Sequence, residues 1–218
     1  MDLPNKENID ELILRNISRE LALSIKEACC LGARRAHTAA QGMDDGHLPS
    51  VVGQLRHFHM NELFHQALAV NGASPSPLCG NRIVTGRSGI FTLARFNTRH
   101  GVWNSGRRSK TRRQMSLANA AIEPLIQPEL FSDYRPPAHA VAFFVAVFPG
   151  SPHNQPDTPA SIEIAIPDRH MENWLFREPL DVLVARYNQL PTVEQTDLAV
   201  PRLKKHVGNQ QDKDGTGS

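Results

Sequence analysis

Positively charged residues without acidic neighbours are the first candidates for chemistry in this chain. Between Glu62 and Glu123 there is no Asp or Glu, whereas the interval holds nine Lys and Arg residues, five of them from Arg107 to Arg113. Cations packed this closely repel one another unless an anion relieves the repulsion. Phosphate groups do so through charge-assisted hydrogen bonds and the release of counterions. We therefore predict that the protein binds nucleic acid, DNA rather than RNA. The predicted contact residues are Arg82, Arg87, Arg95, Arg99, His100, Trp103, Arg107, Arg108, Lys110, Arg112 and Arg113.

The position of three of these cations also favours an anionic partner. Lys110, Arg112 and Arg113 fall at or near the start of a helix that we expect over residues 111–127. Cations at the start of a helix oppose its dipole, and a phosphate bound there would reverse this penalty. Trp103, which lies a few residues before the helix, could offer a stacking surface to a base.

The basic segment is also compatible with roles that involve no nucleic acid. It could be a solvated loop, or it could pair with acidic residues elsewhere in the fold, such as Asp44 and Asp45. It could also face an acidic protein, in which case the chain would be a non-catalytic subunit of a complex. If the protein does bind nucleic acid, it could act as a homodimer.

A second candidate site combines His59, Glu62 and His65 on one expected helix. Residues three or four apart share a helix face, so Glu62 and His65 should lie together beside apolar residues. A carboxylate in such surroundings needs a metal ion, a proton or a partner, and Glu-x-x-His can supply two metal ligands. The alternative function is therefore a metal-dependent nuclease or other hydrolase that uses Mg²⁺, with acids such as Glu163 or Asp168 brought close by folding. The competing interpretation is a partly buried Glu62 paired with His65 or with an arginine.

The order of elements around this helix loosely resembles the core of the PD-(D/E)XK nucleases, in which a helix with a Glu precedes a hairpin, a helix and a central strand. The resemblance covers about half of the chain. Enzymes of that family use acidic residues on the hairpin and the next strand, with a lysine nearby, to hold Mg²⁺ and activate water. Residues Ile90–Phe96 and Ala138–Phe148 contain no Asp, Glu or Lys. The resemblance therefore implies a degenerate relative that does not cleave.

The composition of the 218 residues is ordinary for a globular protein. No apolar run is long enough to span a bilayer, and the first residues lack the basic-then-apolar pattern of a secretory signal. Three cysteines, two of them adjacent, make a poor disulfide framework. These features predict a soluble cytoplasmic protein with no membrane partner, with one domain over residues 1–203 and a disordered polar tail over residues 204–218.

Hydrophobic periodicity predicts an α/β (α+β) fold with the order α-α-β-β-α-β-β-α, in which helices pack on a mixed sheet of about four strands. The expected helices cover residues 8–41, 49–70, 111–127, a segment after Asp168 that includes Met171, Trp174, Leu175 and Phe176, and residues 180–187. The expected strands are a hairpin over residues 81–96 with its turn at Gly86–Gly89, an entirely apolar central strand over 138–148, and a strand over 161–166.

One short run at the end of an expected strand has two interpretations. Pro167, Asp168, Arg169 and His170 follow the strand over residues 161–166, and loops at strand ends often carry function in α/β folds. The simpler interpretation is that Asp168 is the N-cap of the helix that follows.

Overall fold

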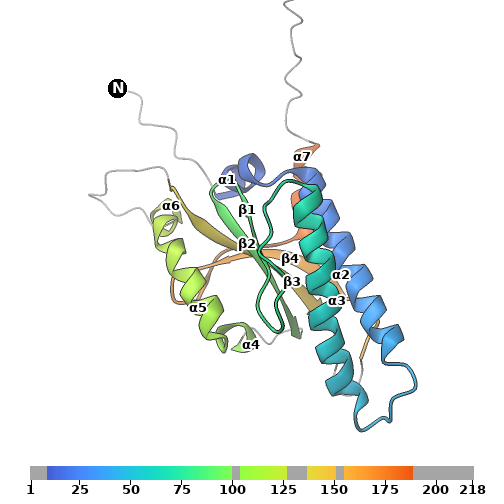
Figure 1. Cartoon of the computed structure of the whole chain (residues 1–218). Helices are drawn as coiled ribbons and strands as arrows, with labels where there is room; N and C mark the ends of the chain where they lie inside the picture. The colour runs from blue at the N-terminus through green and yellow to red at the C-terminus, as the bar shows by residue number, and fades with distance from the viewer. Residues whose placement is uncertain (1–8, 100–103, 127–136, 151–154, 189–218) are drawn as a thin grey trace, which may run out of the picture.

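A five-stranded mixed β-sheet lies between two layers of helices in the computed structural model, which describes residues 9–99, 104–126, 137–150 and 155–188 (Figure 1). The strands are adjacent in chain order, β1-β2-β3-β4-β5. The elements are α1 (Ile9–Asn16), α2 (Arg19–Ala39), α3 (Leu48–Val70), β1 (Thr85–Ser88), β2 (Phe91–Arg99), α4 (Asn104–Arg107), α5 (Lys110–Ser116), the 3-10 helix η1 (Leu117–Ala121), α6 (Glu123–Ile126), β3 (Ala140–Phe148), β4 (Ser161–Pro167), β5 (Trp174–Pro179) and α7 (Leu180–Tyr187). The predicted mixed sheet with packed helices is confirmed, with five strands instead of four.

Strand β3 is the centre of the molecule, because all nine of its residues are buried. Successive side chains of a strand point to opposite faces. Phe144 and its alternate neighbours pack into the core formed with α1, α2, α3 and α7. Phe143 and Val145 pack into a second core, against which the partly buried Met115 of α5 packs. The prediction of a central strand covered on both faces is confirmed.

Strands β2 and β3 are parallel, whereas every other neighbouring pair in the sheet is antiparallel. Parallel neighbours require a crossover connection, because the chain must return to the end of the sheet at which the first strand began before it can start the second strand. The described part of this connection contains α4, α5, η1 and α6, which lie on the face opposite α2 and α3 (Figure 1). The basic segment from Arg107 to Arg113 is therefore part of the crossover.

The N-terminal helical region differs from the single helix expected over residues 8–41. Ser18 has an extended backbone conformation, and its hydroxyl oxygen accepts a hydrogen bond from the backbone N–H of Leu21 at 3.1 Å. Because an N-cap of this kind starts a new helix, the region divides into α1 and α2. The helix expected from Pro49 is confirmed as α3, and Gly72 beyond its end has a φ of +71°.

The expected hairpin is present, but its turn lies later in the chain than the expected Gly86–Gly89. Gly86 and Arg87 lie within β1, and the turn is formed by Gly89 and Ile90. Gly89 has a φ of +54°, a conformation that favours glycine, and the side-chain oxygen of Asn16 accepts the N–H of Ile90 at 3.1 Å. This contact comes from a distant part of the chain, which local turn rules cannot register.

Two expected helices are wrong or incomplete. The residues after Asp168 form a turn and then β5, because Met171 has a φ of +57°, which is incompatible with a continuing helix, and Trp174–Pro179 pairs with β4. The helix expected over residues 111–127 is divided into α5, η1 and α6. The strand over 161–166 and the helix over 180–187 are confirmed as β4 and α7.

In the part of the chain that the structure describes, no helix combines the length and apolar character needed to cross a membrane. The tail predicted over residues 204–218 lies outside the described residues.

Candidate nucleic-acid interface

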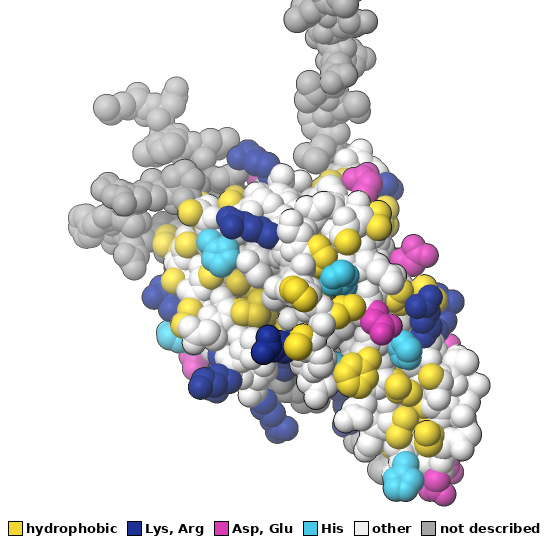
Figure 2. Space-filling view, viewed as in Figure 1, with side chains coloured by type: hydrophobic (Ala, Val, Ile, Leu, Met, Phe, Trp, Pro, Cys, Tyr) yellow, Lys and Arg dark blue, Asp and Glu magenta, His cyan; other side chains and the backbone are white. Residues whose placement is uncertain are grey.

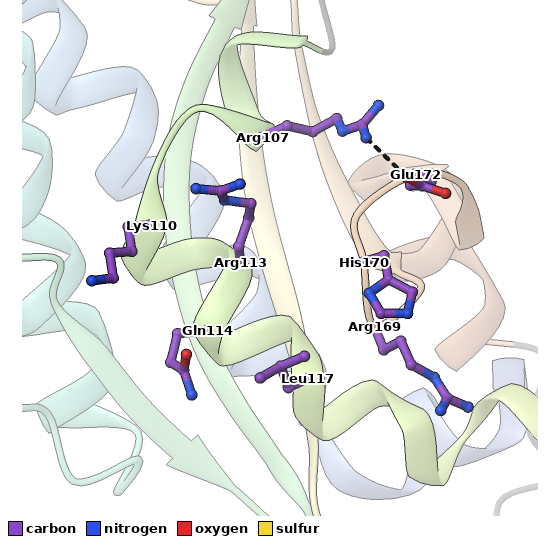
Figure 3. Close-up of a pocket in the computed structure, with 8 residues that line it drawn as sticks. All are labelled: Arg107, Lys110, Arg113, Gln114, Leu117, Arg169, His170 and Glu172. Atoms are coloured by element: carbon purple, nitrogen blue, oxygen red, sulfur yellow. Dashed lines mark hydrogen bonds and ion pairs between the residues drawn. The ribbon is translucent and has the colours of Figure 1, made fainter.

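A surface pocket of about 500 Å³ lies between α5 and the turn that follows β4 (Figure 3). Four side chains with fixed positive charge line it together with a histidine, and a single carboxylate faces them. The lining residues are Arg107, Lys110, Arg113, Gln114, Leu117, Arg169, His170 and Glu172. The fold thus joins the basic segment to a second cationic group more than fifty positions later in the chain.

The first wall of the pocket is held in place from behind by Arg112. Its Nε donates a hydrogen bond of 2.9 Å to the carbonyl oxygen of Gly106, and its guanidinium lies 4.8 Å from the centre of the Phe96 ring. Burial lowers the pKa of Arg112. Ser109 caps α5, because its hydroxyl oxygen accepts the backbone N–H of Arg112 at 3.3 Å. The cation–π contact and the cap fix the direction in which α5 presents Arg113.

The second wall is a turn organised by Asp168. Its carboxylate accepts the backbone N–H groups of His170, Glu172 and Asn173 at 3.1, 2.8 and 2.9 Å. Burial opposes ionisation, but these hydrogen bonds outweigh it and leave the pKa of Asp168 below its usual value. The expectation that Asp168 is the N-cap of a helix is wrong, because no helix follows it; its carboxylate instead accepts the N–H groups of a turn that leads to β5.

Two of the four fixed cations already have carboxylate partners. Arg107 forms an ion pair with Glu172 at 3.3 Å, which joins the end of α4 to the turn (Figure 3). Arg169 donates from its backbone N–H and its Nε to Glu123, at 2.8 and 2.6 Å. For Arg113, no ion pair with another described residue is present, and its side chain is exposed. The pocket therefore keeps an excess of positive charge.

The predicted contact residues fall into several groups. Arg107, Lys110 and Arg113 line the pocket, and Arg108 is exposed beside it. Figure 2 shows Lys and Arg side chains along the lower left, over α4 and α5, whereas the acidic side chains in this view lie mainly over α2 and α3. Three more predicted residues are exposed but do not line the pocket, namely Arg82, Arg87 and Arg99. His100 and Trp103 lie outside the described residues.

Arg95 does not lie on the surface with the other predicted contacts. Its side chain points into the interior, where the residue is only 5% exposed, and its Nε donates to Oδ1 of Asn61 at 3.1 Å. Its Nη1 and Nη2 donate to Oδ1 of Asn97 at 2.9 Å and to the carbonyl oxygen of His57 at 3.1 Å. Burial lowers the pKa of Arg95 to about 10, so it keeps its charge at neutral pH. Its prediction as a phosphate contact is wrong, because an interior guanidinium cannot reach a phosphate in this conformation.

The sequence did not identify Arg169, His170 and Glu172 as part of the same site. The available signal was the position of residues 167–170 at the end of a strand, where ligand-binding loops are frequent. That rule does not predict which element faces the loop across the site. The facing element is α5, which lies on the crossover between β2 and β3.

The alternative site on α3 has a different environment from the one expected. Glu62 is an exposed residue, with 51% of its side chain accessible to solvent, and it lies 3.6 Å from Nδ1 of His59. The expected burial of this carboxylate is therefore wrong. Glu163 pairs with Arg177 at 2.5 Å, on a different element. Among the described residues, no group of three or more His, Cys, Asp or Glu side chains is placed to hold a metal ion, so His59, Glu62 and His65 do not form such a group.

No protein-family model, curated protein or solved structure matches this chain. The chemistry of the pocket is therefore the basis for a functional proposal.

Proposed function

We propose that this protein binds nucleic acid, most directly DNA, and that the pocket between α5 and the turn after β4 holds phosphate. The observation that carries the proposal is the convergence of cations from two distant segments, Arg107 to Arg113 and Arg169, on one concave surface. Neighbouring cations repel one another, and a bound phosphate offsets this repulsion and accepts hydrogen bonds from them.

The geometry supports phosphate more than an acidic side chain of a protein partner. A guanidinium such as that of Arg113 presents a planar fork of donors, which matches two oxygens of a phosphate or of a carboxylate, so the preference must come from the number and spacing of the charges. Exposed Arg99 and Arg108 adjoin the same crossover segment and could contact neighbouring phosphates of one strand. An acidic protein partner would have to place several carboxylates in the pocket, whereas a nucleic-acid strand supplies a charge at every nucleotide.

The proposal also fits a cytoplasmic location, where nucleic acid is accessible. Cys79 is exposed and unpaired, and Cys29 and Cys30 are likewise free thiols. Thiols of this kind persist in a reducing compartment.

The test is binding of the full chain to fluorescently labelled single- and double-stranded DNA and RNA, measured by fluorescence anisotropy across a salt series. We expect the affinity to fall steeply with salt, with a slope that reports the number of phosphate contacts. The variant with both Lys110→Gln and Arg113→Gln should bind less tightly. It should also lower the magnitude of that slope by about 2, because each phosphate contact releases about one counterion on binding.

A matched control removes the same charge elsewhere. Arg34 and Arg35 are exposed on α2, on the opposite face of the sheet, and the double variant Arg34→Gln with Arg35→Gln should keep the wild-type slope. An equal effect of both double variants would mean that net charge, and not the pocket, drives binding. Absence of binding at low salt would refute the proposal.

A further inference from the structure

We infer that the pocket holds the phosphorylated end of a nucleic-acid strand, a terminal phosphomonoester with its nucleotide, and not an internal phosphodiester. The inference rests on the proposed function and specifies which part of the nucleic acid enters the pocket. Three features of the pocket carry it: an end bridged by an ion pair, the amount of positive charge and an apolar side chain at the other end.

The bridged end is formed by the ion pair between Arg107 and Glu172. Arg107 belongs to α4 and Glu172 to the turn after β4, so their contact at 3.3 Å bridges the two walls (Figure 3). An internal phosphate has a chain leaving it in two directions, and a continuous strand lying along this pocket would have to break the bridge. A strand end leaves in one direction only and can enter while the bridge stays intact.

The amount of charge matches a monoester better than a diester. A terminal phosphate has a second pKa of about 6 and therefore carries a charge of about −1.5 to −2 at neutral pH, with three acceptor oxygens. An internal phosphodiester carries a single negative charge. Arg113 comes from α5 and His170 from the turn after β4, so the two line the pocket from opposite walls (Figure 3). Arg107 and Arg169 are paired with Glu172 and Glu123, which leaves Lys110 and Arg113 as two positive charges without an ion pair to a described carboxylate. Two such charges balance a doubly charged monoester and exceed the single charge of a diester.

The remaining volume suits the attached nucleoside. A phosphate alone would leave most of the 500 Å³ empty, and the volume falls in the range of small-molecule sites. Leu117 lies at the end of the pocket away from Arg107 and is 47% exposed, so its apolar surface is accessible from the pocket. Gln114 lies beside it and can donate and accept hydrogen bonds. Together they offer an apolar contact to the sugar or base and a polar contact to a base edge.

The experiment compares short single strands of one sequence that differ only at their ends. Each strand carries the fluorophore on one end and either a hydroxyl or a phosphate on the other, and separate arms place the phosphate at the 5′ or the 3′ end. We expect one phosphorylated form to bind about tenfold more tightly than its hydroxyl counterpart, an effect the size of one charge-assisted hydrogen bond. Competition by a nucleoside monophosphate, but not by the nucleoside, should release the labelled strand.

Variants assign the preference to the pocket. Arg113→Gln should abolish the preference for the phosphorylated end, and Lys110→Gln should weaken it, whereas Arg35→Gln on α2 should leave it unchanged. Equal, salt-dependent binding of all strands would overturn the inference and leave the proposed function intact. A preference that survives Arg113→Gln would also overturn it, because the phosphate would then be recognised elsewhere. Absence of binding by every strand would refute the proposed function as well.

Discussion

Asn119 joins the two walls of the pocket through Pro167: its side-chain amide donates a 2.7 Å hydrogen bond to the carbonyl oxygen of that residue. Asn119 belongs to η1, which continues from α5, and Pro167 is the last residue before the turn that carries Arg169 and His170. The side-chain oxygen of Asn119 accepts the backbone N–H of Val141 at 2.7 Å. One buried side chain therefore fixes the crossover segment to both β3 and β4.

The substitution Asn119→Ala should lower the free energy of unfolding by about 2–3 kcal/mol, because it leaves a buried carbonyl and a buried N–H without partners. Urea denaturation followed by circular dichroism measures this change. Gln66→Ala, at an exposed position of α3, is the control and should alter stability by less than about 0.5 kcal/mol. Equal stability of the two variants would mean that the Asn119 hydrogen bonds contribute nothing to the fold.

Removing the acidic member of the pocket should strengthen binding. Glu172→Gln frees Arg107 and removes the carboxylate that repels phosphate, so we expect affinity for DNA to rise about two- to fivefold, as expected for an exposed charge pair. The backbone N–H of Glu172 still donates to Asp168, so the turn should persist. Glu27→Gln, exposed on α2, makes the same charge change far from the pocket. Anisotropy titrations in which Glu172→Gln binds more weakly than this control would contradict the site.

Arg95 should affect stability and not binding. Arg95→Met leaves Oδ1 of Asn61, Oδ1 of Asn97 and the carbonyl of His57 without their donor. We expect a loss of about 2–3 kcal/mol in the free energy of unfolding, measured in urea. The affinity of the folded fraction for DNA should stay within about twofold of the wild type, since the residue is interior. A stable variant with much weaker binding would make Arg95 a nucleic-acid contact after all.

Two glycines in the paired helices α2 and α3 should respond in opposite ways to alanine. A Cβ added at Gly32 would lie 2.7 Å from the Cα of Met60, so the two helices would have to separate, at a cost of about 1–3 kcal/mol. A Cβ at Gly53 meets nothing within 4 Å, and alanine there should stabilise the protein by about 0.5–1 kcal/mol through its higher helix propensity. The melting temperatures of the two variants, measured by thermal denaturation, test both expectations. A melting temperature for Gly32→Ala equal to or above that of the wild type would contradict the close approach at Gly32, and a lower one for Gly53→Ala would contradict the open position at Gly53.

Acid should destabilise the protein through the two carboxylates that hold the turn. Burial opposes the ionisation of Asp168, and likewise that of Glu123, but hydrogen bonds to each leave both pKa values below the usual ones. A lowered folded-state pKa contributes stability above the unfolded-state pKa, and that stability is lost as the pH falls through the folded-state value. Unfolding free energies in urea should therefore decrease from about pH 5 to about pH 3.

The variant Asp168→Asn cannot titrate and should flatten part of this decrease. Its side-chain oxygen can still accept hydrogen bonds, so the turn should form. An identical pH profile for the variant and the wild type would show that Asp168 does not carry the effect.

The sequence predicts those parts of the fold whose signal is local. Strand β3 is apolar at every position, and α3 begins at Leu48, immediately before Pro49, and ends before Gly72. The turn of the hairpin and the strand β5 could not be predicted in this way. The first depends on Asn16, seventy or more positions earlier, and the second on pairing with β4.

The candidate site likewise has one part that the sequence predicts and another that depends on tertiary contacts. The basic segment is visible in the sequence because five of its seven residues from Arg107 to Arg113 are charged, but this count does not reveal which of the arginines are structural. Arg95 is interior because α3 supplies acceptors to it, and Arg112 is half-buried because it lies on Phe96. Arg169 joins the pocket through its bonds to Glu123 of α6 and through the hydrogen bond of Asn119 to Pro167. Each of these contacts is tertiary, so local patterns carry no trace of it.

The buried strand β3 also has a consequence for synthesis of the protein. Its nine residues are apolar and pair on one edge with β2, which precedes them, and on the other edge with β4, which is made later. A nascent or truncated chain that ends between Phe148 and Ser161 has one edge of this strand unpaired. Exposed apolar edges of this kind recruit strands from other molecules. Strand β4 therefore protects the newly made chain from self-association, and fragments that lack it should collect in the insoluble fraction.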